Sequence, residues 1–262
     1  MKKTTYRDER ISHLEKYAEN RSMPIGGTYN NIPYKHILKL EHNDKRHVVS
    51  CYNIIKGVPS DLLPNSLHRF AHHLNSSQIL CYNFFRPMLT SDARATEELV
   101  SLLKQYGIKI ALGSKCTFEY NDGAGDGSEF DFHVQSGEVE VFFEVKYTEQ
   151  GFGRANNDEK HQNKFEEIYK NNLFNKEECL LKKPDYQEFI NKYQLYRNAI
   201  RVTDKNKFLV LLYPKANVIV HKQATEFIGD KINNTYKDNV KALHWEDVIT
   251  DKECELYCKY LG

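Results

Sequence analysis

The chain has 262 residues, of which 40% are hydrophobic and 28% are charged. This composition allows a sizeable core and excludes a disordered protein. Lysine and arginine number 37 against 36 aspartate and glutamate, so net charge does not attract the chain to nucleic acid or to an acidic membrane, and a DNA site would need local charge segregation. No CxxC pair, apolar signal segment or run of roughly 20 apolar residues is present. We therefore expect reduced thiols and a cytoplasmic location.

The first 64 residues are expected to form an extension with one helix and an irregular part. Ile11, Leu14 and Ala18 recur at helical spacing within residues 4–20, and the segment MPIGGTYNNIPYKH then breaks the pattern with Pro and Gly. The core begins at Asn65, where the stretch NSLHRFAHHLNSSQILCYNFF is apolar on nearly every face. That pattern predicts a helix packed on several sides.

A second helix is expected over about residues 93–106. Its leucines, including Leu99 and Leu103, lie on one face, and Gly107 ends it. Glu98 lies at the edge of that face, from which a side chain can reach towards a neighbouring sheet.

Three strands are expected next, followed by a helix and a buried strand. The strand-like runs are KIALGSKCTFEY, EFDFHV and VEVFFEVKY, and the short connections NDGAGDGS and QSGE between them predict an antiparallel meander. The segment DYQEFINKYQLYRNAI has an apolar helical face, and FLVLLY is continuously apolar, which is typical of a strand covered on both faces.

The third strand carries the most informative pattern. Side chains alternate across a strand, so Glu144 and Lys146 share one face and lie roughly 6.6 Å apart along the strand. Val145 and the residues two positions before and after it take the other face. The same alternation in EFDFHV places Phe130, Phe132 and Val134 on one face and Asp131 and His133 on the other.

If the two strands pair through QSGE, Asp131 can approach Glu144. Two carboxylates beside a lysine suit a hard divalent cation such as Mg²⁺, which prefers oxygen ligands and keeps several waters. The lysine can orient the attacking water or help to deprotonate it, and it offsets phosphate charge.

These residues resemble a known signature. Asp131, followed thirteen positions later (144 − 131) by Glu144-Val145-Lys146, resembles the PD-(D/E)XK motif of restriction-endonuclease-like nucleases, although Phe130 stands where the motif has Pro. The phrases HHLNSSQILCYNFF, EVKYTE and YQLYRN are also similar to one bacterial restriction-endonuclease-like family, and the resemblance covers roughly residues 65–215.

The resemblance implies an α/β fold with an αβββαβ core, in which helices flank a mixed central sheet. It assigns residues 65–262 to a restriction-endonuclease-like nuclease domain and leaves residues 1–64 as the extension. It further implies that Asp131, Glu144 and the carbonyl of Val145 bind Mg²⁺ or Mn²⁺, and that Lys146 aids hydrolysis of the phosphodiester.

Other site residues are suggested by the same resemblance. Glu98 resembles the acidic residue that many such nucleases supply from the first core helix, but Gln78 on the preceding helix is an alternative, and so is a purely solvated Glu98. On the helix after the meander, Gln194, Arg197 and Arg201 fall on one flank. Related nucleases place a glutamine and basic residues there. Gln194 is thus a candidate catalytic residue, and Gln78, Arg197 and Arg201 are candidate DNA contacts; an exposed polar face is the alternative.

The sequence therefore predicts a magnesium-dependent, type II restriction-like endonuclease that cuts double-stranded DNA, with defence against foreign DNA as a suggested role. The alternatives are a repair or recombination nuclease and a catalytically silent nucleic-acid-binding module. A homodimer is expected by analogy alone. Replacing Lys146 by Ala is expected to remove most cleavage while the fold and much of the DNA binding persist.

Overall fold

The structure is a computed structural model that describes residues 4–40, 44–121, 123, 129–174, 181–182 and 184–262. Most of the NDGAGDGS connection lies outside these residues. The strands are β1 (Ile25–Tyr29), β2 (Ile32–Leu38), β3 (Lys115–Asn121), β4 (Glu129–Ser136), β5 (Val139–Val145), β6 (Lys207–Tyr213) and β7 (Val240–His244). The α-helices are α1 (Tyr6–Asn20), α2 (Lys45–Val48), α3 (Ser77–Phe85), α4 (Glu97–Gln105), α5 (Glu159–Lys164), α6 (Tyr186–Asn191), α7 (Tyr193–Ala199), α8 (Val218–Lys231), α9 (Trp245–Val248) and α10 (Glu255–Tyr260). Short π- or 3₁₀-helical segments are η2 (Val49–Asn53), η3 (Arg86–Met88), η4 (Phe165–Phe174) and η5 (Asn234–Asn239).

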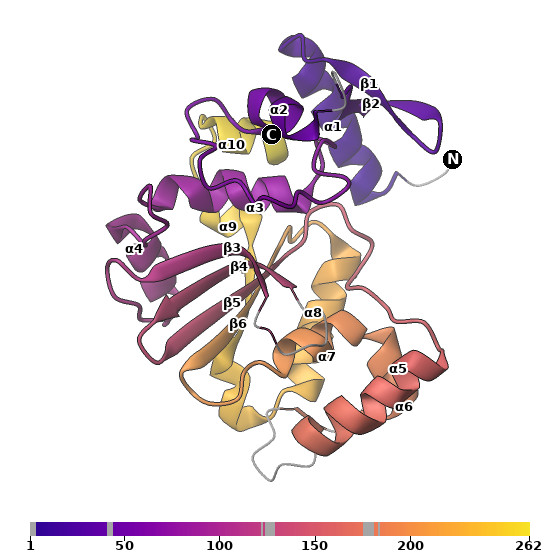
Figure 1. Cartoon of the computed structure of the whole chain (residues 1–262), viewed down its shortest axis with the longest axis vertical. Coiled ribbons are helices and arrows are strands. Elements are labelled where there is room, and N and C mark those ends of the chain that lie inside the picture. Colours follow the sequence, from indigo (N-terminus) through magenta and orange to yellow (C-terminus); the bar gives the residue numbers. More distant parts are fainter. Residues whose placement is uncertain (1–3, 41–43, 122, 124–128, 175–180, 183) are drawn as a thin grey trace.

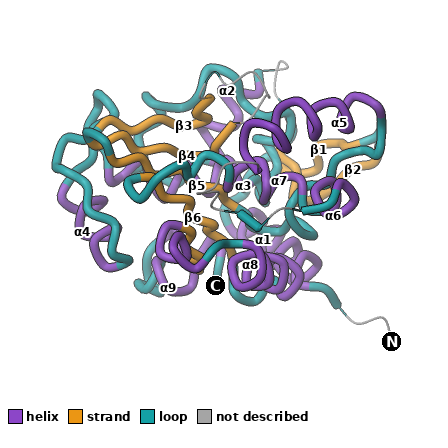
Figure 2. Tube along the Cα trace, turned by 90° about the horizontal axis from the view of Figure 1, so that it is seen from below, coloured by secondary structure: helices purple, strands orange, loops and turns teal. Residues whose placement is uncertain are grey.

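The centre of the molecule is a five-stranded sheet in the order β3-β4-β5-β6-β7 (Figure 1). β3, β4 and β5 pair antiparallel, as the short connections predict. β6 pairs parallel with β5 on one side and with β7 on the other. Helices surround these strands (Figure 2). The mixed sheet and the αβββαβ order confirm the predicted restriction-endonuclease-like fold class.

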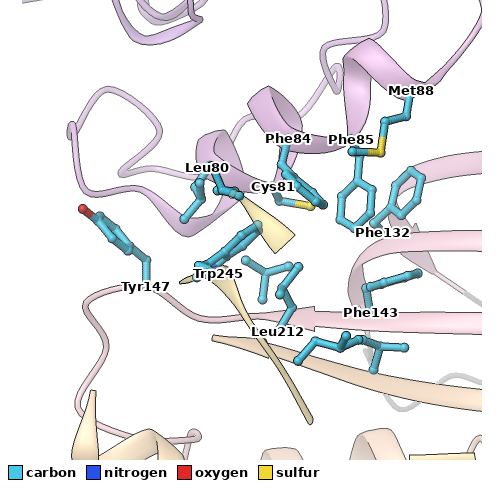
Figure 3. Packing of buried hydrophobic residues seen from close by; sticks show 14 of the residues in the cluster. Leu80, Cys81, Phe84, Phe85, Met88, Phe132, Phe143, Tyr147, Leu212 and Trp245 are labelled. Atoms are coloured by element: carbon cyan, nitrogen blue, oxygen red, sulfur yellow. The ribbon is translucent and has the colours of Figure 1, made fainter. Parts of the chain in front are cut away.

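Two hydrophobic clusters cover the two faces of the sheet. Figure 3 shows the first, in which Phe84 and Phe85 of α3 pack over Phe132, Phe143 and Trp245. The second cluster includes residues of α7 and α8 on the opposite face. The FLVLLY strand contributes to both clusters. Val210 and Leu212 belong to the first cluster, and Leu209, Leu211 and Tyr213 belong to the second. Its predicted cover on both faces is confirmed.

The first core helix is shorter than its sequence predicts. Residues 65–76 form turns, and α3 begins at Ser77, where the Ser76 hydroxyl accepts a hydrogen bond from Ile79 N–H at 3.4 Å. The preceding backbone is held by β2 instead, since Leu74 N–H donates to His36 O at 2.9 Å. Pairing with a neighbouring strand therefore replaces the helix before the cap. From Gln78 to Phe85 every residue of α3 is buried, which confirms the packing on several sides.

Two other helices also differ in their bounds. α4 begins at Glu97 rather than near Ala93, because Ala93 has a positive φ of 58° and Thr96 is extended. The helix predicted over residues 185–200 is divided into α6 and α7 at Lys192, whose φ of −119° interrupts the helical backbone. The apolar face continues across this break.

The N-terminal segment packs against the core. Leu14 and Ala18 of α1 and Leu38 of β2 belong to the same cluster as α3. Arg10 also donates a hydrogen bond to Leu261 O at 3.0 Å, which joins α1 to the segment after α10. The division into an extension of residues 1–64 and a domain of residues 65–262 stays a prediction. Within the described ranges, no helix combines the length and apolarity that a membrane crossing requires.

Candidate active site

Three carboxylates, which we call the acidic row, lie at the same level of three neighbouring strands. Phe132 of β4 pairs with Phe143 of β5, so Asp131 and Glu144 are the residues that follow the end of this pairing. On the other side, Glu119 of β3 stands between Phe118 and Tyr120, which pair with Phe132 and Phe130, so it is level with Asp131. All three acidic residues line one cavity of about 750 Å³. Sheet register therefore brings together groups that are far apart in the sequence.

The cavity also contains most of the other candidate residues. Lys146, Val145, Gln78 and Gln194 line it with the acidic row. They come from β5 and its end, from α3 and from α7. The strand end, the first core helix and the helix after the meander thus meet at one place.

Glu144 is buried and held by three side-chain donors. It is 2% exposed, and its Oε1 accepts hydrogen bonds from Lys146 Nζ at 2.6 Å and Gln194 Nε2 at 2.7 Å. Asn198 Nδ2 donates to Oε2 at 2.6 Å. Gln194 is itself fixed, because its Oε1 accepts from Gly153 N–H at 3.0 Å. Charge-assisted bonds of this kind fix the direction of the carboxylate.

Lys146 is a buried member of an ion pair and is only 8% exposed. Burial favours its neutral amine, but the carboxylates of Glu144, Glu149 and Asp131 outweigh that effect and raise the pKa of Lys146. The side chain therefore stays protonated at neutral pH. The expectation that its loss would leave stability almost unchanged assumed a surface lysine, and the burial of the pair contradicts it. Its backbone is also fixed, because Trp245 Nε1 donates to Lys146 O at 2.9 Å.

Asp131 has a different environment. Its side chain is half-buried, and its Oδ2 accepts a hydrogen bond from Val145 N–H at 2.7 Å. Burial, together with the negative charges of Glu144 and Glu119, raises the pKa of Asp131 well above its usual range, and Lys146 and the Val145 N–H oppose the shift. The site therefore has an excess of negative charge.

The side-chain bond of Asp131 to Val145 N–H also changes the end of the strand. The pairing of β4 with β5 ends at Phe132 in this direction. Phe130 packs with Phe142 in the second cluster, with ring centroids 4.8 Å apart. The prediction that Phe130 shares a face with Phe132 and Val134 is therefore wrong, because the Asp131 side chain takes the N–H that a regular ladder would use.

The residues present fit a hard divalent cation. A carboxylate has about four acceptor positions, so the hydrogen bonds described above leave positions free on both Asp131 and Glu144. Across the described ranges, no three His, Cys, Asp or Glu side chains form a ready metal cage. Mg²⁺ does not need one, since it is usually bound through one or two carboxylates and keeps several waters. A cation would also offset the charge that raises the pKa of Asp131.

The structure separates the two candidates for the first-helix residue. Gln78 on α3 is buried and lines the cavity. Glu98 is exposed on α4, at the left-hand end of the sheet in Figure 1, and is not among the lining residues. The alternative reading of Glu98 as a solvated surface residue fits this placement, and the core helix over the site is α3.

The two arginines of the predicted flank do not join the cavity lining. Arg197 is half-buried, with its guanidinium carbon 5.6 Å from the centre of the Tyr193 ring. Arg201 follows the end of α7 and is also half-buried. Of the three residues on the predicted flank, Gln194 is the one that donates a hydrogen bond to Glu144. The face of α7 towards the site repeats every four residues, so the next residue on that face is Asn198, and Arg197 and Arg201 lie away from it.

Two residues of the site escaped prediction. Asn198 stands four residues after Gln194, so the helical repeat that marked Gln194 also marks Asn198. Glu119 lies on the first strand of the meander, and antiparallel pairing of KCTFEY with EFDFHV places it opposite Asp131. Burial raises the pKa of Glu119 to about 7; Gln78 opposes the shift, and Glu129 and Glu144 add to it. Its φ of 50° is unusual for a residue in a strand, and nothing in the sequence indicates it.

Comparison with known proteins identifies one family. The model of the family described as "Restriction Endonuclease associating with ARP" matches residues 11–258. None of the curated proteins and none of the solved structures gives a significant match. The matched range includes the whole sheet, every cavity-lining residue except Arg7, and most of the N-terminal segment.

Proposed function

We propose that this chain, which belongs to the family described as Restriction Endonuclease associating with ARP, is a nuclease that hydrolyses phosphodiester bonds of double-stranded DNA with Mg²⁺ or Mn²⁺. The observation that carries the proposal is that Asp131 and Glu144 line one cavity together with Lys146, which donates a hydrogen bond to Glu144. The family supports nuclease function in general. The metal, the DNA substrate and the roles of individual residues belong to the proposal.

Asp131, Glu144 and the carbonyl of Val145 would hold the cation. Bound there, it would supply positive charge for the phosphate and acidify a water molecule. Glu144 can act as a rigid ligand because Gln194 and Asn198 fix both of its oxygens. Such supporting contacts orient a ligand and tune the site.

Lys146 would act through its charge. Because its pKa is raised, it is a poor general base at neutral pH, and of the two roles suggested by the sequence we favour the orienting one. Its ammonium group can donate a hydrogen bond to the attacking water or to the phosphate and stabilise the negative charge that develops in the transition state. Proton removal then falls to solvent or to the substrate phosphate.

The direct test is cleavage of supercoiled plasmid DNA with Mg²⁺ or Mn²⁺, beside reactions with Ca²⁺ and with a chelator. Wild-type protein should cut only with the first two metals, and Glu144→Gln should reduce the rate by about 100-fold or more. Glu98→Gln is a matched control, since Glu98 is an exposed carboxylate outside the cavity. Equal rates for wild type and Glu144→Gln would contradict the proposed site.

Sequencing of the cut ends would separate a type II restriction-like enzyme from a repair or recombination nuclease. Absence of cutting with every metal, together with retained DNA binding, would favour the catalytically silent module. The role in defence, the cytoplasmic location, the homodimer and the DNA contacts of Arg197 and Arg201 stay predictions.

A further inference from the structure

Part of the cavity lining is aromatic. It is built by the β1–β2 hairpin and by residues 65–76, and we call its members the aromatic wall: Tyr29, Tyr34, His68, Phe70 and His73. Phe70 is central, because its ring centroid lies 5.4 Å from that of Tyr29, 5.2 Å from that of His68 and 4.9 Å from that of His73. None of these five side chains is fully buried, and Tyr29 is 40% exposed. The wall therefore presents ring surface to the cavity.

The wall is fixed to the core. Ile37 of β2 forms an antiparallel bridge with His73, and Leu38 N–H donates to His72 O at 3.1 Å. The segment then continues directly into α3, which carries Gln78. In Figure 1 the hairpin lies at the top of the molecule, above the sheet. The wall and the acidic row thus belong to one packed unit.

The imidazoles of the wall are uncharged at neutral pH. Burial lowers the pKa of His73 to about 3, and neighbouring histidines add to the shift. Burial also lowers the pKa of His68. Positive charge near the wall comes from two arginines: Arg7 lines this part of the cavity, and the guanidinium carbon of Arg69 lies 4.4 Å from the centre of the Phe70 ring. Neutral rings are better suited to stacking than to binding an anion.

Two amides near the wall have an unused end. Gln78 Oε1 accepts a hydrogen bond from His68 N–H at 3.0 Å, which fixes the orientation of the amide. Its buried Nε2 lies near Glu119, whose pKa it helps to lower, and makes no hydrogen bond of normal geometry among the described residues. Asn75 Nδ2 donates to Thr148 Oγ1 at 2.8 Å, and the buried Oδ1 of Asn75 is likewise without a partner in the described ranges. Both residues line the cavity. A buried donor or acceptor left unpaired is costly, so these atoms point to a ligand with polar edges.

We propose that the aromatic wall and the amides of Asn75 and Gln78 hold one unpaired nucleobase while its phosphate faces Asp131 and Glu144. The inference rests on the proposed metal-dependent nuclease chemistry and redefines its substrate: a DNA strand with an unstacked nucleotide, either extruded from a duplex or single-stranded. Aromatic rings stack on every base, and base edges pair with amide groups. A cavity of about 750 Å³ falls within the range of roughly 300–1,000 Å³ that encloses a small organic ligand.

The test measures DNA affinity in Ca²⁺, a hard cation of the same charge, by anisotropy of labelled oligonucleotides. The probes are a single strand, a series of the same strand in which a different position is abasic in each member, a fully paired duplex and a duplex with one mismatch. In wild type, removing the base at one position should weaken binding by about tenfold. The mismatched duplex should bind more tightly than the paired one, since extrusion of an unpaired base is easier. Tighter binding of the single strand than of the mismatched duplex identifies a single-stranded substrate. Tighter binding of the mismatched duplex identifies a base extruded from a duplex.

Phe70→Leu keeps apolar volume and removes the central ring, so it should abolish the difference between intact and abasic strands. Tyr29→Ala should reduce that difference and spare the hydrophobic core, because Tyr29 is 40% exposed. Tyr106→Leu, at the end of α4, is a matched control that should behave as wild type. If wild type binds intact and abasic strands equally, or if both Phe70→Leu and Tyr29→Ala keep the full difference, the inference is overturned.

The same samples separate this inference from the proposed function. Metal-dependent plasmid cleavage with no dependence on any single base would keep the nuclease and overturn the base site. Base-dependent binding that requires Phe70, with no cleavage in Mg²⁺ or Mn²⁺, would keep the base site and overturn the proposed chemistry.

Discussion

Asp131→Asn should make the metal-free protein more stable and the metal-loaded protein less so. The substitution keeps the shape of the side chain, and the amide oxygen can still accept from Val145 N–H. It removes a negative charge that lies in the same cavity as Glu144 and is repelled by it. The raised pKa of Asp131 records the cost of that charge, which arises first from burial and then from Glu144 and Glu119.

The magnitude follows from the shared site. Two carboxylates that could bind one cation have charge centres about 5 Å apart, and two like charges at that separation repel by about 3 kcal/mol at an effective dielectric constant of about 20. Lys146 offsets part of this repulsion, so we expect a net gain of about 1–2 kcal/mol without metal. In a domain of this size that corresponds to an increase in Tm of about 2–8 °C.

Metal should reverse the order of the two proteins. A cation at about 100 times its Kd would stabilise the wild type by about 2.7 kcal/mol, whereas Asp131→Asn lacks one ligand and should gain little. The assay is thermal unfolding by circular dichroism in a chelator and again with increasing Mg²⁺ or Mn²⁺. The reasoning is refuted if the variant is less stable than wild type in the chelator, or if metal stabilises both proteins equally.

Three further outcomes are expected. Lys146→Ala should slow single-turnover plasmid cleavage by about 100-fold. It should also lower the free energy of unfolding by up to about 3–5 kcal/mol, because one member of a buried pair is removed. Thermal unfolding defines a temperature at which the variant is folded, and a wild-type cleavage rate at that temperature would reject the catalytic role of Lys146. Gln194→Ala should weaken metal binding by about tenfold or more, since it frees one side of Glu144; unchanged affinity in calorimetric titration would show that Asn198 suffices. Burial lowers the pKa of Lys259 to about 7, so between about pH 7 and pH 10 the unfolded chain binds more protons than the folded chain. The free energy of unfolding should therefore rise with pH by up to about 4 kcal/mol over this range. Lys259→Met should remove most of this pH dependence in urea titrations, and an unchanged pH dependence would contradict the assignment.

The strands and their faces were predictable because their side chains alternate by chemistry. Glu144 and Lys146 share a face in any strand that includes them both, and the apolar run FLVLLY needs cover on both sides wherever it lies in the sheet. Short connections fixed the antiparallel order of the meander. These are local properties, and tertiary packing left them unchanged except at Phe130, where the Asp131 side chain interrupts the alternation.

What the sequence did not reveal depends on contacts between distant segments. The start of α3 was misplaced because β2, some forty residues earlier, takes the backbone groups that a longer helix would use. The third carboxylate, Glu119, becomes a neighbour of Asp131 only through the register of β3 with β4. The burial of Lys146 similarly follows from α7 and the loop after β5, and a strand pattern by itself does not distinguish a buried lysine from an exposed one.

The hydrogen bond between Trp245 and the Lys146 carbonyl makes the site optically observable. The chain contains a single tryptophan, which is fully buried and lies 5.1 Å from the Phe84 ring, measured between ring centroids. Its indole N–H is bonded to the peptide unit that carries the lysine. Indole emission is sensitive to local polarity and hydrogen bonding, so a small movement of this strand end changes the spectrum. Selective excitation of tryptophan over the 17 tyrosines thus gives a label-free signal from the back of the cavity, suited to stopped-flow measurement of cation and DNA entry in the unmodified protein.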